Sequence, residues 1–128
     1  MGRTLSWLGL PALLALVVAC GGAADAASSV LDARLAAIEA QIEVRTSVLA
    51  CVSDADCGVL GLGALACGGP ARHRVYSARV SGREAMESLA AEHQRLSAQK
   101  LGASGALGVC TVVPPPAVGC VQAVCTQR

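Results

Sequence analysis

Aromatic side chains are almost absent from this chain of 128 residues, which has no Phe, one Tyr and one Trp. The Trp is Trp7, in an apolar N-terminal segment, so Tyr76 is the only aromatic residue in the rest of the chain. A platform on which sugars or bases stack needs several aromatic rings. We therefore expect no such platform, and the length allows only one small domain.

An excess of charge of one sign is also missing. The chain has ten Lys and Arg residues against nine Asp and Glu residues, and one of the ten is Arg3 near the N-terminus. The remainder is therefore electrically neutral. Electrostatic binding to nucleic acid requires a basic surface, so we expect no nucleic-acid partner.

The N-terminus has the pattern of an export signal. Arg3 precedes an apolar run at residues 5–18, which is shorter than the roughly 20 residues of a membrane-spanning helix. The run ends in the residues Val-Val-Ala-Cys at positions 17–20, which resemble the lipobox of bacterial lipoproteins. The resemblance implies cleavage after Ala19 and acylation of Cys20, which would hold the protein to a membrane.

The residue after Cys20 is Gly21 and not Asp, and the sorting rule of enteric bacterial lipoproteins then implies the outer membrane. The alternative is an ordinary secretory signal cleaved near residues 24–26, which would give a periplasmic or secreted protein. Either route leaves six cysteines for disulfides, because Cys20 is acylated in the first and removed with the signal in the second. An even number suits a disulfide framework in an oxidising compartment.

The chain divides into three predicted parts: a lipoprotein signal peptide at residues 1–19, a flexible tether at 20–28, and a cysteine-rich α+β domain at 29–128. The tether is predicted from its Gly, Ala and Ser residues. For the domain we expect a small disulfide-stapled fold with two helices and a few short antiparallel strands.

The first helix is predicted over about residues 30–50. Ser29 and Asp32 match a capping signal. The apolar residues that follow have helical spacing and form one seam: Leu31, Leu35, Ile38, Ile42 and Leu49. We expect the seam to pack on the domain's own core. The alternative is self-association through a coiled coil, although Arg45 interrupts the seam.

The second helix is predicted from Gly82 to about Leu101, with Ser81 and Glu84 as a capping box and Gly102 after its end. Strands are predicted at four places: Val59–Ala66, His73–Tyr76, Val109–Val113 and Cys120–Thr126. A turn at 67–70 and a rigid connection at Pro114–Gly119 join them.

The six cysteines left after Cys20 are predicted to form disulfides: Cys51, Cys57, Cys67, Cys110, Cys120 and Cys125. Three precede the second helix and three follow it, so pairs between the two groups would tie both ends of the domain around that helix. Sequence alone leaves fifteen pairings open. The spacing contains no C-x2-C and the chain has two histidines, so we expect no metal and no cofactor.

The C-terminal part resembles a group of small cysteine-rich bacterial secreted proteins and lipoproteins. The resemblance covers about 75 residues and rests on CVSDADC at 51–57, CGGP at 67–70, Tyr76-Ser77, and the terminal C-x9-C-x4-C. The group has no established activity. The resemblance therefore implies location and fold, and no chemistry.

Enzymatic residues are not evident in the sequence. His73 and His93 are the natural general bases. His93 lies on the apolar seam of the second helix, where we expect a core or boundary histidine whose hydrogen bonds the protein satisfies, and His73 lies between two arginines, where we expect a solvated, basic surface. No nucleophile or phosphate-loop motif is present. We expect no catalytic residue, and a cleft holding both histidines would change this interpretation.

A local basic cluster is the candidate anion-binding site: Arg72, Arg74, Arg79 and Arg83. Arginine forks match phosphate oxygens, while a merely solubilising face is the simpler interpretation. The connection Pro114–Gly119 lies between two cysteines, as do the binding loops of several small protease inhibitors.

These patterns predict a lipid-anchored cell-envelope protein, held to the membrane by its lipid, that acts as a non-enzymatic module on an envelope protein partner. Two alternatives stay open. One is an inhibitor of a hydrolase that presents Pro114–Gly119. The other is a structural protein that self-associates through the helix at 30–50, and the sequence does not set the oligomeric state.

Overall fold

The computed structural model describes residues 22–108 and 110–128. The predicted signal peptide and the lipidation site at Cys20 lie outside these residues. The elements in chain order are α1 (Gly22–Arg45), the 3-10 turn η1 (Asp54–Asp56), β1 (Cys57–Leu62), β2 (Arg72–Ser77), α2 (Ala78–Ser81), α3 (Arg83–Ser104), β3 (Val118–Val121) and β4 (Val124–Gln127). The predicted α+β class with two long helices is confirmed.

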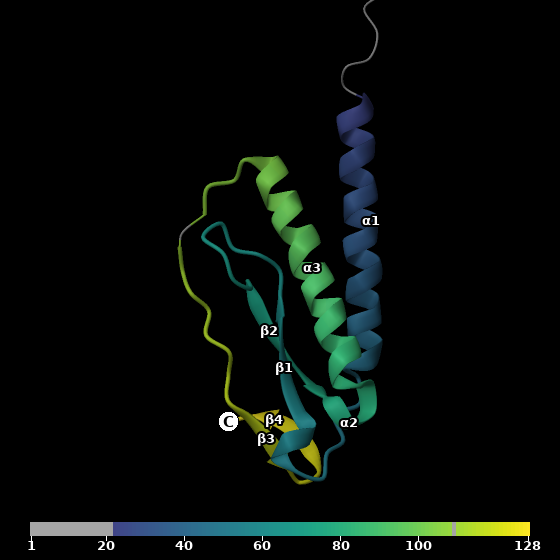
Figure 1. Cartoon of the computed structure of the whole chain (residues 1–128), viewed down its shortest axis with the longest axis vertical. Coiled ribbons are helices and arrows are strands. Elements are labelled where there is room, and N and C mark those ends of the chain that lie inside the picture. Colours follow the sequence, from purple (N-terminus) through teal and green to yellow (C-terminus); the bar gives the residue numbers. More distant parts are fainter. Residues whose placement is uncertain (1–21, 109) are drawn as a thin grey trace, which may run out of the picture.

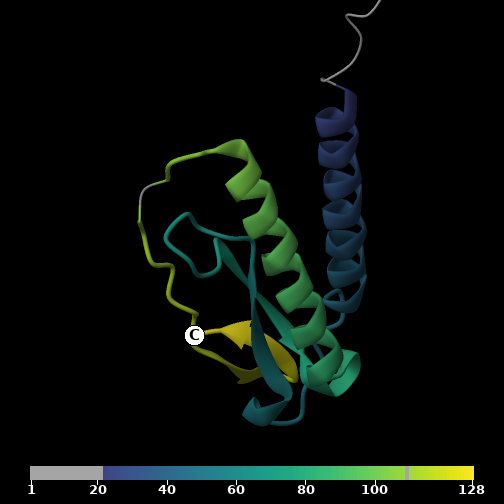
Figure 2. The same ribbon diagram turned by 45° about the horizontal axis from the view of Figure 1, so that its top comes forward.

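The two long helices lie along the length of the molecule, with the β1–β2 hairpin beside α3 and the β3–β4 hairpin at one end (Figure 1). The first turns of α1 extend beyond the end of α3, at the pole opposite β3 and β4, in both views (Figures 1 and 2). Among the described helices, none is long and apolar enough to cross a membrane.

Both faces of the β1–β2 hairpin are covered. Because side chains alternate along a strand, Leu60 and Leu62 point to the helices, where they join a core with Ile42, Met86 and Leu96. Tyr76 belongs to the same face, and a Cβ atom on Gly58, its partner in register, would collide with the Tyr76 ring. The other face packs on a smaller core of cysteines and their apolar neighbours.

Helix α1 begins seven residues before the predicted capping residue Ser29, so residues 22–28 are helical and do not form the predicted flexible tether. Alanine has the highest helix propensity, and four of these residues are alanine. Ser29 is inside the helix, where its Oγ donates a hydrogen bond to the Ala26 carbonyl at 2.9 Å. Residues 22–30 are all exposed.

The same helix ends at Arg45, five residues earlier than predicted. Thr46 and Ser47 hydrogen-bond to the carbonyls of the last turn, and Ser81 donates to the Arg45 carbonyl at 2.6 Å. The seam packs on the domain's own core, as predicted, with Ile38 and Ile42 buried and Leu35 partly buried against them. This packing occupies the surface that the self-association alternative requires.

The predicted caps of the second long helix are wrong. Ser81 ends the short helix α2, and Gly82, with φ of 76°, is the N-cap of α3 without a side-chain bond. At the other end Gly102 is helical, and Gly105 takes the left-handed C-cap position with φ of 64°. Glycine reaches such dihedrals without the clash of a Cβ atom. Gly102 and Gly105 could both have ended the helix, and the structure ends it at Gly105.

The C-terminal strands also differ from the prediction. Residues 110–113 are not a strand, and the predicted single strand Cys120–Thr126 is the hairpin β3–β4. Gln122 and Ala123 form its turn with φ of 50° and 61°. Two consecutive positive φ values are typical of a type I′ turn. Neither residue is Gly or Asn, the residues typical of this turn, so the turn could not be predicted from the sequence.

Three disulfides confirm the predicted framework: Cys51–Cys120, Cys57–Cys125 and Cys67–Cys110. Each joins one cysteine from before α3 to one from after it. The bridges therefore tie the two ends of the domain around that helix, as pairing between the groups would require.

Candidate functional site

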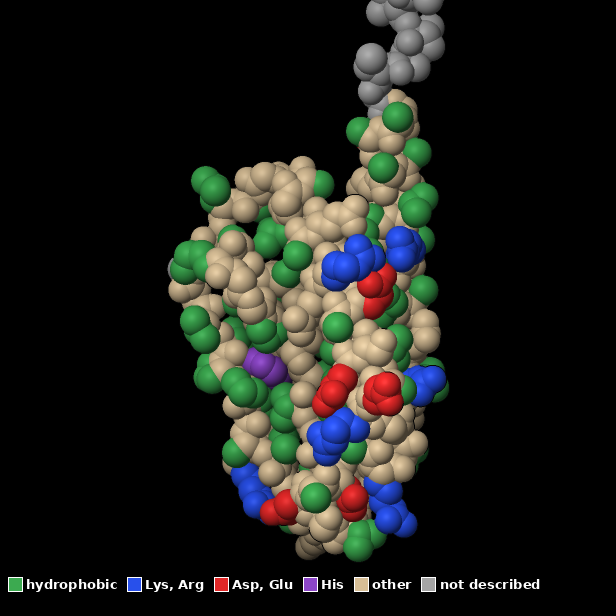
Figure 3. Space-filling view, in the orientation of Figure 1, with side chains coloured by type: hydrophobic (Ala, Val, Ile, Leu, Met, Phe, Trp, Pro, Cys, Tyr) green, Lys and Arg blue, Asp and Glu red, His purple; other side chains and the backbone are tan. Residues whose placement is uncertain are grey.

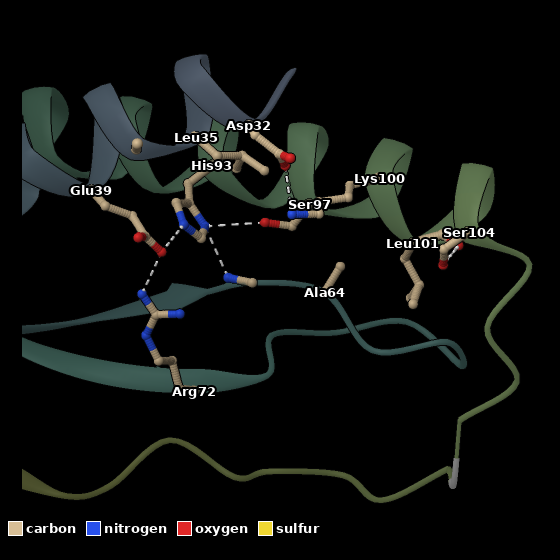
Figure 4. A pocket seen from close by; sticks show the side chains of 12 residues that line it. Asp32, Leu35, Glu39, Ala64, Arg72, His93, Ser97, Lys100, Leu101 and Ser104 are labelled. Atoms are coloured by element: carbon tan, nitrogen blue, oxygen red, sulfur yellow. Dashed lines mark hydrogen bonds and ion pairs between the residues drawn. The ribbon is translucent and has the colours of Figure 1, made fainter. Parts of the chain in front are cut away.

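A groove of about 490 Å³ opens between α1, α3 and the end of β1. Its polar residues come from three elements, with Asp32 and Glu39 on α1, Arg72 on β2, and His93 and Lys100 on α3. The side chains of Glu39, His93 and Arg72 point toward one another in this groove (Figure 4).

His93 is 2% exposed and both of its ring nitrogens are bonded. The Gly63 N–H donates to Nδ1 at 3.0 Å, so the proton of the neutral ring lies on Nε2, which donates to Glu39 Oε1 at 3.0 Å. The ring thereby joins α3, α1 and the end of β1. The sequence prediction that His93 is a satisfied, buried histidine is confirmed.

Glu39 links this histidine to β2. Its Oε1 also accepts a hydrogen bond from Arg72 at 2.9 Å. The Arg72 guanidinium, followed by His93, holds the pKa of the Glu39 carboxyl below its ordinary value. Glu39 could not be singled out by sequence reasoning, because it lies 54 positions from His93 and belongs to no motif.

Ser97, His93 and Glu39 form a row that looks like a hydrolase triad. Ser97 Oγ lies 3.4 Å from His93 Nδ1. A general base must have a free lone pair facing the nucleophile, but the Gly63 N–H already occupies Nδ1 at the shorter distance. This row is therefore arranged to fasten the fold and not to activate a serine.

His73 lies on the opposite face of the β1–β2 hairpin from Arg72 and Arg74, because strand residues alternate. The expectation of a basic surface around it is therefore wrong: His73 is half-buried, and its Nδ1 is buried without a hydrogen-bond partner among the described residues. His93 contacts the helix side of the hairpin. The two histidines consequently do not share a cleft.

The four arginines of the candidate anion site are mostly engaged by the protein itself. Arg72 pairs with Glu39 and Arg74 with Glu43, the latter at 2.5 Å. Arg83 donates to the Ala55 carbonyl at 3.0 Å. Carboxylates therefore compensate the charges of Arg72 and Arg74, whereas Arg83 and Arg79 have no carboxylate partner among the ion pairs of the described residues. With half of its charge compensated, the cluster is a weaker anion site than the sequence suggested.

The sulfur atoms of Cys51, Cys57 and Cys125 lie within 4.8 Å of one another and are buried. This proximity would suit a metal if the sulfurs were thiolates. Each is instead bonded in a disulfide, so the cluster offers no thiolate ligand in this state. It forms the centre of the smaller core.

The segment that we call the strap, residues 110–117, runs in extended form between α3 and β3 (Figure 1). The bridge Cys67–Cys110 fixes its start, and the bridge Cys51–Cys120 fixes the strand that follows. The Arg128 N–H also donates to the Ala117 carbonyl at 2.9 Å. The strap contains four of the six residues of the predicted Pro114–Gly119 connection: Pro114, Pro115, Pro116 and Ala117.

No family model, curated protein or solved structure matches this chain.

Proposed function

We propose that this protein is a lipid-anchored cell-envelope protein whose disulfide-stapled domain acts as a non-enzymatic binding module. The observation that carries the proposal is the position of α1, which begins at Gly22, two residues after the lipobox cysteine. The first nine residues of the helix are exposed. They suit a stalk that is attached to a membrane at one end and to the domain at the other.

A helical stalk would act differently from a flexible tether. A helix rises about 1.5 Å per residue, so nine residues give a rigid offset of roughly 13 Å. Such an offset would fix the direction of the domain as well as its distance from the membrane. The β3–β4 hairpin, at the opposite pole (Figure 1), would then face away from the lipid surface.

Two further observations support a binding role outside the cytosol. Three disulfides are typical of proteins in oxidising compartments. The groove's most buried polar group, His93, has both nitrogens satisfied by the protein itself. The outer membrane is the address that Gly21 implies, and a partner protein in the envelope is the expected ligand.

The test is metabolic labelling with an alkyne-bearing fatty acid in a bacterium that expresses the full chain. We expect label on the wild type and none on Cys20→Ser. The matched control is Cys67→Ser, which removes an exposed cysteine from the domain and should keep the label. An unlabelled wild type, or equal labelling of Cys20→Ser, would refute the anchor.

A further inference from the structure

The strap belongs to a long stretch without charge. From Leu101 to Gln127 the sequence contains no Asp, Glu, Lys or Arg. Six of the eight strap residues are exposed, and Val112 is 86% exposed. Figure 3 shows charged side chains over the helices and near the C-terminal hairpin, while the side along which the strap runs carries apolar and uncharged atoms. An exposed apolar surface of this kind typically marks an interaction site.

Local sequence favours a polyproline II conformation in the strap. Proline fixes φ near −65°, and a residue before proline is driven to extended conformations. Val113, Pro114 and Pro115 all precede a proline. Val113 and Pro116 are the half-buried residues of the strap, three positions apart, which matches the three residues per turn of this helix.

The strap's attachments reduce the cost of binding. The disulfides of Cys110 and Cys120 hold it near both ends, and the prolines restrict the backbone between them. A segment that is already ordered loses little conformational entropy when a partner binds it. Its outward residues, Val112, Pro114 and Pro115, are therefore presented in a fixed arrangement.

Three consecutive prolines also select the binding mode. Pro114, Pro115 and Pro116 have no backbone N–H, so this part of the strap cannot donate the backbone hydrogen bonds with which a strand joins a sheet edge or an extended substrate binds in a hydrolase cleft. Aromatic rings stack on prolines and bind such helices in grooves. We infer that the strap is the ligand of a partner protein whose groove is lined with aromatic side chains.

A membrane is a less suitable partner for this segment. The strap has no Lys or Arg for lipid headgroups and no Trp or Tyr for the interface. Its exposed backbone carbonyls lack the internal hydrogen bonds that hydrocarbon demands. A groove in a protein supplies both the aromatic surface and the donors.

The test uses indole, the Trp side-chain analogue, as the probe. It is titrated into the protein purified with its three disulfides formed, while NMR follows the valine and proline carbons. We expect saturable shifts at Val112, Pro114 and Pro115, with affinity about tenfold weaker in Pro114→Ala/Pro115→Ala because the ring surface is lost. Pro70→Ala, a proline outside the strap, should bind like the wild type.

Absence of strap shifts, or equal affinity in the double variant, would overturn the inference. So would stronger strap shifts with phosphatidylethanolamine–phosphatidylglycerol vesicles than with indole. The inference rests on the proposed binding role, but the titration does not depend on Cys20. Failure of the labelling test and failure of this test are therefore distinguishable.

Discussion

His93 is the residue at which separate segments of the chain are fastened together. Its ring bonds to the Gly63 backbone and to the Glu39 carboxylate at 3.0 Å each. Removing it would leave the Gly63 donor unsatisfied and open a cavity beside Leu96, which is fully buried. Both effects are costly in a protein interior.

We predict that His93→Ala lowers the free energy of unfolding by about 3 kcal/mol, measured by denaturant unfolding with the disulfides intact. Arg95→Ala, two positions further along α3 with a 57% exposed side chain, is the control and should change it by less than about 0.5 kcal/mol. A loss that is equally small in both variants would show that His93 is not a fastening point.

Glu39 makes the same cluster sensitive to acid. Arg72, and then His93, lowers the pKa of its carboxyl in the folded protein. A carboxyl with a depressed folded-state pKa stabilises the protein above its unfolded-state pKa, about 4.3, and this contribution disappears as the pH falls through the folded-state value. The Glu39 side chain is 48% exposed, so solvent screening keeps the contribution modest.

We therefore expect wild type to be more stable than Glu39→Gln near neutral pH, and the difference to shrink as the pH is lowered from about 6 to about 3. Denaturant unfolding at each pH measures it. Glu87→Gln, an exposed carboxyl on α3, serves as the control. A difference that stays constant with pH would contradict the role given to the Arg72 and His93 contacts.

Secondary-structure elements whose residues have strong periodicity could be predicted from the sequence. The seam around Ile38 and Ile42 correctly predicted the first long helix and its buried face. The spacing of Met86 and Leu96 predicted the second long helix. Their ends could not be predicted. In the sequence, Ser81 fits a capping box at the start of the second long helix. In the fold, its hydroxyl donates to the Arg45 carbonyl, 36 positions away.

The candidate site was predictable only in part. His93 was correctly placed in the interior because it shares the spacing of Met86 and Leu96. Its partner Glu39 depends on how α1 and α3 pack, and no local pattern reports that packing. The pairing of six cysteines has the same character, since each bridge joins residues at least 43 positions apart.

The β3–β4 turn offers a test at the level of one element. Ala123 has φ of 61°, which costs an L-residue roughly 1–2 kcal/mol. We predict that Ala123→Gly raises the free energy of unfolding by roughly 0.5–1 kcal/mol. The same change at Ala91, an exposed position in α3, should lower it by about 1 kcal/mol. If both substitutions changed the free energy of unfolding in the same direction, the left-handed conformation assigned to Ala123 would be wrong.

At the scale of the whole molecule, the three bridges connect parts that a small core would hold weakly. The chain-entropy account assigns about 4 kcal/mol to a bridge that closes a loop of 43 residues. Cys67 and Cys110 are exposed, while Cys57 and Cys125 are buried. Loss of the second pair should therefore also disturb the core around it.

We predict that Cys67→Ser/Cys110→Ser lowers the free energy of unfolding by about 4 kcal/mol at most, and that Cys57→Ser/Cys125→Ser lowers it further. Thermal and denaturant unfolding report both losses, and proteolysis should cut the strap faster in the first variant. If the exposed pair proved the more important of the two, the assignment of the buried cysteines to a core would be wrong.

We propose one arrangement of the seven cysteines, in which one carries lipid while the other six form three bridges in a domain supported by a helical stalk. Its most direct test is the intact mass of the protein recovered from cells, with and without reduction. We predict a chain that begins at Cys20, carries the added mass of acyl chains, and gains six hydrogens when three disulfides are reduced. A chain that retains residues 1–19, or whose mass is unchanged on reduction because its thiols are free, would contradict the account.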